Sequence, residues 1–192
     1  MKALCFKSAN ACKWTKDAPP YDPVAAKKLL AEAGYPNGFD VEITALTGLL
    51  KPVGEAMSGA FRKIGVRAKV QTLSFGVYRK KSNTGKLQVL AGWYTSSGYP
   101  EGSMWLDFFF SPTGRNYWRD KEIDAIRRKG NSILDPAKRR EIFKEAFDLI
   151  NKKVYMVPIS TTPGVLAHTK EIRLKPGGLT SFGVTPGDIF WK

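Results

Sequence analysis

Side chains suited to chemistry gather in one stretch, residues 92–110, which reads GWYTSSGYPEGSMWLDFFF. Aromatic rings there are interleaved with serines and with glycine backbone. Rings offer a large contact area at low entropic cost, and hydroxyl groups with bare backbone supply hydrogen bonds at close range. These residue types are typical of the wall of a small-molecule binding site.

Catalytic side chains are scarce. Proton or acyl transfer commonly needs a histidine, a perturbed cysteine or a carboxylate pair beside a nucleophile. The single histidine, His168, lies in a polar stretch near the end and is interpreted as a surface residue. No G-x-S-x-G, Walker, H-E-x-x-H or G-x-G-x-x-G sequence occurs. We therefore expect a protein that is not an enzyme and that uses no cofactor.

The two cysteines, Cys5 and Cys12, lie close together in a polar N-terminal segment without a histidine or a second pair near them. A metal site needs about four ligands, so these two alone do not form one, and no metal site is expected. A disulfide that closes the short loop is one alternative. The interpretation that we favour is two incidental thiols.

The net charge of +14 raises the question of a nucleic-acid partner. The basic residues are dispersed over several regions, and no RNP, zinc-finger or helix-turn-helix pattern accompanies them. We favour an ordinary solvated basic surface and expect no nucleic acid. The alternative is a basic single-stranded nucleic-acid-binding module that stacks bases on the aromatic residues, and it predicts a steep loss of affinity with salt.

No apolar run approaches the roughly 18 to 20 residues of a membrane span. The apolar stretch near the N-terminus, residues 3–6, is shorter than the core of a signal peptide, so the chain as given carries no signal peptide. With 43% hydrophobic and 25% charged residues, the composition predicts a folded, water-soluble protein.

Helical and strand patterns alternate before the aromatic stretch. Asp22-Pro23 is a helix-start signal, and Gly34 a helix end. The period-two pattern of residues 39–45 predicts a strand with one buried face. The following pattern predicts a helix over 53–64, weakened by Gly54 and Gly59, then a strand over 66–70, a short helix over 74–83 and a strand over 87–93 buried on both faces. This order implies parallel pairing through right-handed crossovers, and hence an α/β fold.

The remainder is mainly helical and then irregular. Helices are predicted near Asp120 and from Asp135-Pro136 onward. Residues 156–167 look extended, and the chain from residue 175 carries mostly turn residues with isolated aromatics, so we expect it to lie along another part of the protein.

The expected fold indicates where a ligand binds, because ligands settle outside the carboxyl ends of the strands in an open parallel sheet. Residues at or after the three predicted strand ends form what we call the ligand wall: Thr47, Phe75, Trp93, Tyr94, Ser96, Ser97 and Tyr99. Trp105, Leu106 and Phe109 are instead interpreted as the buried face of a helix.

Several stretches, in order and spacing, resemble the C-terminal part of the extracytoplasmic solute-binding proteins of ABC importers, in the peptide and nickel family known as family 5. They are YDPVAAKKLLAEAGYPNGFDVEI (21–43), FRKIGVRAKVQTLSFGVY (61–78), the GW and YP of 92–100, WRDKEIDAI (118–126) and DPAKRREIFKEAFDLINKKVYMVPI (135–159).

The resemblance implies a type II periplasmic-binding-protein-like lobe, with a mainly parallel sheet flanked by helices and an extended C-terminal segment. It implies three divisions: an unmatched segment at 1–20, a solute-binding lobe at 21–155 and a crossover at 156–192 that returns to another lobe. Such proteins are monomers outside the cytoplasm that close on a solute and deliver it to a membrane permease. Because they are far longer, the resemblance also implies a truncated fragment, whether natural, made by cloning or a gene remnant.

One departure concerns specificity. Peptide-binding members resemble GW-x-x-D-Y, in which the acidic residue pairs with the amino terminus of the peptide. This chain reads GWYTSSGYPEG, with Gly98 before Tyr99 and no carboxylate at that place. Glu101 would substitute only if the loop folded back. The expected solute is therefore a peptide or an uncharged, polyol-like compound.

Overall fold

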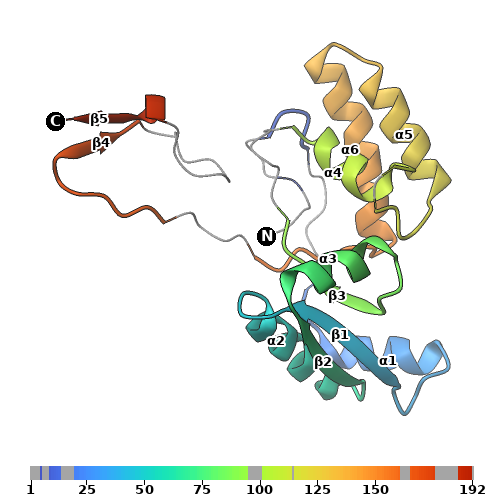
Figure 1. Cartoon of the computed structure of the whole chain (residues 1–192). Coiled ribbons are helices and arrows are strands. Elements are labelled where there is room, and N and C mark those ends of the chain that lie inside the picture. The colour runs from blue at the N-terminus through green and yellow to red at the C-terminus, as the bar shows by residue number, and fades with distance from the viewer. Residues whose placement is uncertain are drawn as a thin grey trace. The chain divides into compact units, whose positions relative to one another are not determined.

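The computed structural model describes residues 5, 9–13, 20–94, 101–113, 115–160, 165–175 and 186–191 (Figure 1). The chain divides into two compact units. The sheet unit comprises Pro19–Tyr94 and Arg115–Tyr117. The helical unit comprises Met1–Ala18, Thr95–Gly114 and Trp118–Lys192.

The sheet unit alternates helices and strands in the predicted order. Its elements are α1 (Pro23–Glu32), β1 (Asp40–Leu46), α2 (Lys51–Lys63), β2 (Arg67–Leu73), α3 (Phe75–Asn83) and β3 (Val89–Ala91). The sheet has the strand order β2-β1-β3, and both neighbours of β1 run parallel to it. The predicted α/β fold with parallel pairing is confirmed.

Local chemistry explains where α1 begins and ends. The Asp22 carboxylate accepts hydrogen bonds from the N–H groups of Val24 and Ala25, which have no partner within the first turn. Gly34 follows the helix with a φ of 89°, a conformation that glycine adopts at little cost. Both predicted signals are therefore confirmed.

Helix α2 packs against β1 and β2 at close range (Figure 1). Gly54 is buried in this contact, and a Cβ atom there would lie 3.1 Å from Val70 Cγ1. The buried hydroxyl of Ser58 donates to the Ala68 carbonyl at 2.7 Å. Gly54, which the sequence pattern indicates as a weak point of the helix, instead allows the helix backbone to approach the sheet.

Two strand predictions need correction. Thr44 occupies the outward face of the alternating pattern, yet it is fully buried, because β1 is the central strand and contacts both α2 and α3. The strand predicted over 87–93 is limited to Val89–Ala91 and lies at an edge of the three-stranded sheet. Two of its three residues are only half-buried, since no further strand pairs with it among the described residues.

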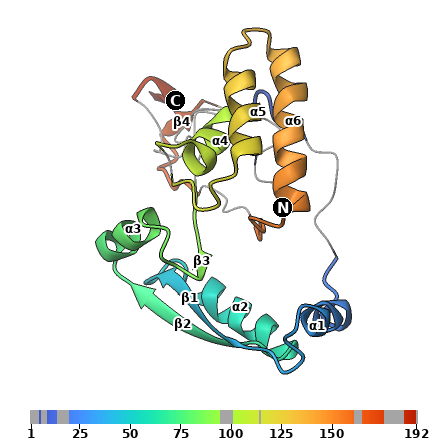
Figure 2. The same cartoon turned by 90° about the vertical axis from the view of Figure 1, so that its right-hand side faces the viewer.

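The helical unit is built on α4 (Ser103–Phe110), α5 (Lys121–Asn131) and α6 (Pro136–Lys152). Helices α5 and α6 run side by side, and α4 packs on α5 (Figure 2). The Asp120 and Asp135 carboxylates cap α5 and α6 as predicted. On α4, the predicted core residues Trp105, Leu106 and Phe109 are buried.

The prediction of two incidental thiols at Cys5 and Cys12 is wrong, because the two residues form a disulfide. A tight turn brings their Cα atoms to 6.0 Å, a separation that a disulfide spans. In this turn Ala11 adopts a φ of 54°, and the Cys12 N–H donates to the Ala9 carbonyl. The segment is anchored to the helical unit where the Gly102 N–H donates to the Asn10 carbonyl at 2.7 Å.

The C-terminal part contains a strand pair that the sequence reading missed. Strands β4 (Ile172–Leu174) and β5 (Ile189–Trp191) pair antiparallel, and a 3-10 helix, η1 (Pro186–Asp188), leads into β5. Residues 156–160 and 165–167 form no regular element. Within the described ranges, no helix is long and apolar enough to cross a membrane.

Candidate ligand-binding site

The sheet brings three parts of the predicted ligand wall to one edge. Leu46 pairs with Leu73, and the Thr47 N–H donates to the Leu73 carbonyl at 2.9 Å. On the other side of β1, Ala45 pairs with Ala91 in parallel register. Thr47, Phe75 and Trp93 each follow the carboxyl end of one of these adjacent strands, where ligands bind in open parallel sheets.

The wall residues at this edge present apolar rings to the surface. Trp93 is 51% exposed and Phe75, the first residue of α3, is 57% exposed. Thr47 is exposed, and Tyr94 is half-buried. The predicted wall residues Ser96, Ser97 and Tyr99 lie outside the described residues. Exposed rings beside a hydroxyl suit a binding surface that is completed by further groups or by the ligand.

A buried tyrosine that the sequence reading missed supports this edge. The Tyr78 hydroxyl donates to the Ala91 carbonyl at 3.1 Å, and both residues are buried. Burial raises the pKa of Tyr78, so the hydroxyl stays protonated and remains a donor at neutral pH. This bond fixes the end of β3 two residues before Trp93. The sequence feature that could have indicated this role is that Tyr78 is followed by five polar residues in α3, so that it is the only aromatic residue in this half of the helix.

Tyr117 ties the returning chain to the far end of α3. Its hydroxyl donates to the Ser82 carbonyl, and its ring lies beside Gly85. Burial raises the pKa of Tyr117 as well, with the Arg115 charge acting in the opposite direction. Helix α3 is therefore held at both ends by tyrosine hydroxyls, which keeps Phe75 in a fixed position relative to the sheet.

Glu101, the carboxylate considered as a substitute for the missing acidic residue, has a partner of its own. Its Oε1 atom lies 3.1 Å from Arg139 Nη2, and both side chains are about three-quarters buried. An interaction between Glu101 and a ligand amine would have to compete with this ion pair.

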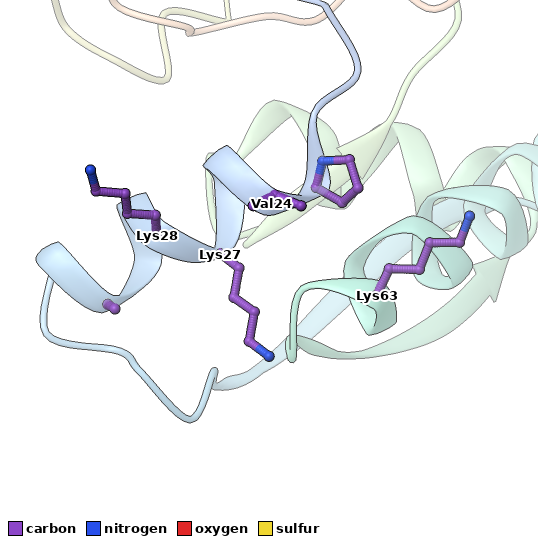
Figure 3. Close-up of a pocket in the computed structure, with 6 residues that line it drawn as sticks. Val24, Lys27, Lys28 and Lys63 are labelled. Atoms are coloured by element: carbon purple, nitrogen blue, oxygen red, sulfur yellow. The ribbon is translucent and has the colours of Figure 1, made fainter.

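Among the surface hollows formed by the described residues are two in the sheet unit, and neither of these is lined by the predicted wall residues. The first lies between α1 and the end of α2 (Figure 3). Because α2 runs back from β1 to the start of β2, its end lies at the amino edge of the strands, opposite Trp93. The hollow is lined by Pro23, Val24, Lys27, Lys28, Ala31 and Lys63. The second runs along α3, lined by Gly76, Val77, Lys80, Lys81, Thr84 and Lys86.

The described residues offer little for metal or acid–base chemistry. They contain no group of three or more His, Cys, Asp or Glu side chains able to hold a metal ion. His168 is exposed, and its ring nitrogen Nδ1 lies 2.7 Å from the carbonyl oxygen of the next residue. The described part of the site therefore consists of aromatic, hydroxyl and backbone groups.

Comparison with known proteins decides the family. The model of the bacterial extracellular solute-binding proteins, family 5 middle region, matches residues 7–117. The chain belongs to this family. The resemblance found in the sequence motifs is thereby confirmed, and the match begins within the N-terminal segment that those motifs left uncovered.

Curated relatives of this chain are named for different ligands. Di/tripeptide-binding protein 1 of Pseudomonas aeruginosa is 31% identical over 182 residues, covering 87% of this chain and 33% of the relative. Heme-binding protein A of Haemophilus influenzae is 29% identical over 155 residues, covering 76% of this chain and 28% of the relative. The chain thus spans about a third of the length of these relatives.

Solved structures agree on the fold. The periplasmic binding protein DppA from Helicobacter pylori, solved with the peptide STSA, superposes with a TM-score of 0.80 at 20% identity, covering 99% of this chain and 39% of that one. HbpA2 from Haemophilus parasuis gives a TM-score of 0.73 at 24% identity, and the superposition covers 100% of this chain and 40% of HbpA2. The predicted periplasmic-binding-protein-like fold is confirmed.

Proposed function

We propose that the chain forms part of a solute-binding protein that delivers a small solute to the permease of an ABC importer. The observation that carries the proposal is the common edge of the sheet, where Thr47, Phe75 and Trp93 follow three adjacent strand ends in a member of a solute-binding family. Ser96, Ser97 and Tyr99 extend this ligand wall in the proposal. The protein acts outside the cytoplasm, as a monomer, without enzymatic activity.

The proposed division of the chain follows the crossover between lobes. Residues 21–155 supply most of one lobe, residues 156–192 return toward the other, and residues 1–20 precede both. When the two lobes close over the solute, water leaves the site, and each polar contact becomes stronger in the drier environment. One lobe alone buries only part of the ligand surface, so the 192-residue chain binds its solute far more weakly than a complete two-lobed protein.

The proposed solute class is a peptide or an uncharged, polyol-like compound. Relatives carry names for di- and tripeptides, heme and glutathione, so family membership leaves the class broad. Between Glu55 and Glu101 the chain has no acidic residue at all. An ammonium group of the solute would find no carboxylate in the ligand wall, which favours solutes recognised through ring stacking and hydroxyl hydrogen bonds.

Ligand-observed NMR tests the proposal, because it detects the weak binding expected of one lobe. The chain is screened against dipeptides, tripeptides and oligosaccharides, and each hit is repeated with Trp93→Ala. Loss of a central aromatic contact weakens binding by about tenfold. Trp191→Ala, which removes an 82% exposed tryptophan from β5, is the matched control and leaves the signal unchanged. Hits that bind the Trp93→Ala variant as strongly as the unaltered chain refute the wall assignment.

A further inference from the structure

The basic charge of this protein is largely offset by acidic side chains in one part of the chain and not offset in another. Residues 118–152 carry ten basic and seven acidic side chains, whereas residues 56–100 carry eight basic side chains and no acidic one. The dispersed distribution seen in the sequence thus conceals a local excess. Its members are Arg62, Lys63, Arg67, Lys69, Arg79, Lys80, Lys81 and Lys86.

Four of these lysines gather around α3 and the neighbouring strand β2. Lys81 donates to Gln71 Oε1 at 3.2 Å, which joins the end of α3 to β2. Lys69 lies two residues before Gln71 and therefore on the same face of the strand. Lys80, Lys81 and Lys86 line the hollow along α3. We call Lys69, Lys80, Lys81 and Lys86 the lysine surface.

The lysine surface is exposed, and one acidic side chain, Glu42, lies beside its four positive charges. All four residues are exposed. Glu42 stands opposite Lys69 in the β1–β2 ladder, but among the residues that the structure describes no ion pair within 4.0 Å joins a carboxylate oxygen to any of the four lysines. Other cations of the same unit are paired, such as Arg67 with Asp40 at 2.7 Å. Four positive charges beside a single carboxylate leave a net positive potential that attracts an anionic partner.

The form of the lysine surface indicates the kind of partner. Lys80, Lys81 and Lys86 line the hollow along α3, and Lys69 lies on the neighbouring strand β2, so the four charges spread over two elements and suit an extended anionic surface better than one small anion. Lysines are point charges on flexible stems and impose no fixed geometry on the groups they contact. Val77, 48% exposed, adds one aliphatic side chain beside them, and no aromatic ring lines the hollow, although base stacking by single-stranded nucleic acids uses such rings.

We propose that the lysine surface docks the protein onto an anionic lipid bilayer. Clusters of four or more basic side chains bind anionic headgroups, and each contributes roughly a fivefold gain in partition at low salt. The choice of a bilayer rests on the proposed function, because a solute-binding protein that delivers to a membrane permease works next to such a surface. Docking would confine the protein near the membrane independently of whether solute is bound.

Sedimentation with vesicles tests this proposal on the 192-residue chain. Vesicles with one part phosphatidylglycerol to three parts phosphatidylcholine are compared with pure phosphatidylcholine, at low and at high salt. The chain sediments with the anionic vesicles only, and less at high salt, because salt screens exposed charges. The variant Lys80→Ala/Lys81→Ala lowers the partition coefficient by about 25-fold, from two lysines at about fivefold each.

The control is Lys138→Ala/Arg140→Ala on α6, which removes the same charge from two exposed positions of the acid-balanced region. Equal losses in both double variants would mean that net charge alone acts, and would overturn the proposal. No sedimentation of the unaltered chain with anionic vesicles would also overturn it. A third result would also overturn the proposal: the chain binds an oligothymidylate more tightly than it binds vesicles, and Lys80→Ala/Lys81→Ala abolishes the oligothymidylate binding. That result would favour a nucleic-acid partner. The solute test through Trp93→Ala stays separate, because neither double variant alters the ligand wall.

Discussion

At Gly130 the packing of α5 on α6 leaves no room for an additional methyl group. A Cβ atom at Gly130 would lie 2.0 Å from Cε1 of Phe143, with Cδ1 and Cζ of the same ring at 2.6 and 2.7 Å. The Phe143 side chain is fully buried, so its ring has no solvent-filled space into which it could move. The glycine lets the two helices approach closely over this ring.

Two opposing terms set the effect of Gly130→Ala on the free energy of unfolding. Alanine favours a helix interior over glycine by about 1 kcal/mol. Against this, carbon atoms pack at about 3.5 Å, so the ring or the helix must move by more than 1 Å, and overpacking of a core typically costs about 1–3 kcal/mol. Because the contact at 2.0 Å is severe, the cost lies at the upper end, and we expect a net destabilisation of about 1–2 kcal/mol.

Gly59 in α2 provides the matched control, since a Cβ there meets nothing within 4 Å. Gly59→Ala should therefore stabilise by about 0.5–1 kcal/mol through helix propensity alone. Thermal unfolding followed by circular dichroism compares the two variants, at about 2–4 °C per kcal/mol for a chain of this size. If Gly130→Ala raised the midpoint as Gly59→Ala does, the packing argument would be refuted. Adding Phe143→Leu to Gly130→Ala should cost less than the sum of the single changes, because the smaller side chain relieves the clash.

Two further predictions concern hydrogen bonds. Tyr78→Phe keeps the ring but leaves the buried Ala91 carbonyl without its donor, and should lower the free energy of unfolding in urea by about 1–2 kcal/mol; an unchanged urea midpoint would contradict the role given to Tyr78. Burial raises the pKa of Asp120, but hydrogen bonds from Lys153, from the Ile123 N–H and from Tyr155 outweigh it and hold the pKa below its usual 3.8. The stabilisation is therefore present above pH 3.8 and is lost as the pH falls through the lower, folded-state pKa. Asp120→Asn, which retains a capping oxygen, should destabilise the protein at pH 6, and this effect should shrink as the pH falls progressively below 3.8, as thermal midpoints across that range would show. A destabilisation that is the same at every pH would contradict the prediction.

The sequence predicted best what depends on neighbours along the chain. The helix starts at Asp22, Asp120 and Asp135 follow from one carboxylate and the free N–H groups just after it, and the alternation of β1 shows its strand period. These patterns were sufficient to predict that Thr47 and Trp93 follow the carboxyl ends of strands of the sheet.

What the sequence did not show depends on partners far away in the chain. The burial of Thr44 requires knowing that β1 is central, and the value of Gly54 requires knowing which side chain faces it across the sheet contact. Strands β4 and β5 have three residues each, and a strand of this length is too short to show an alternating pattern of apolar and polar residues. At Cys5 and Cys12, spacing alone did not reveal the turn that brings the two sulfur atoms together.

The division into units implies an order of events during synthesis. Residues 20–94 of the sheet unit are continuous, so this part can pair its strands as soon as it has emerged from the ribosome. The helical unit can be completed only later, because its N-terminal segment contacts residues that are synthesised long afterwards. The Asn10 carbonyl accepts a hydrogen bond from the Gly102 N–H, and Lys13 Nζ lies 2.6 Å from Glu141 Oε1. Closing that long loop costs less entropy once the intervening residues are already compact. Refolding should therefore show a fast phase for the sheet unit and a slower one in which the N-terminal segment joins helices made much later.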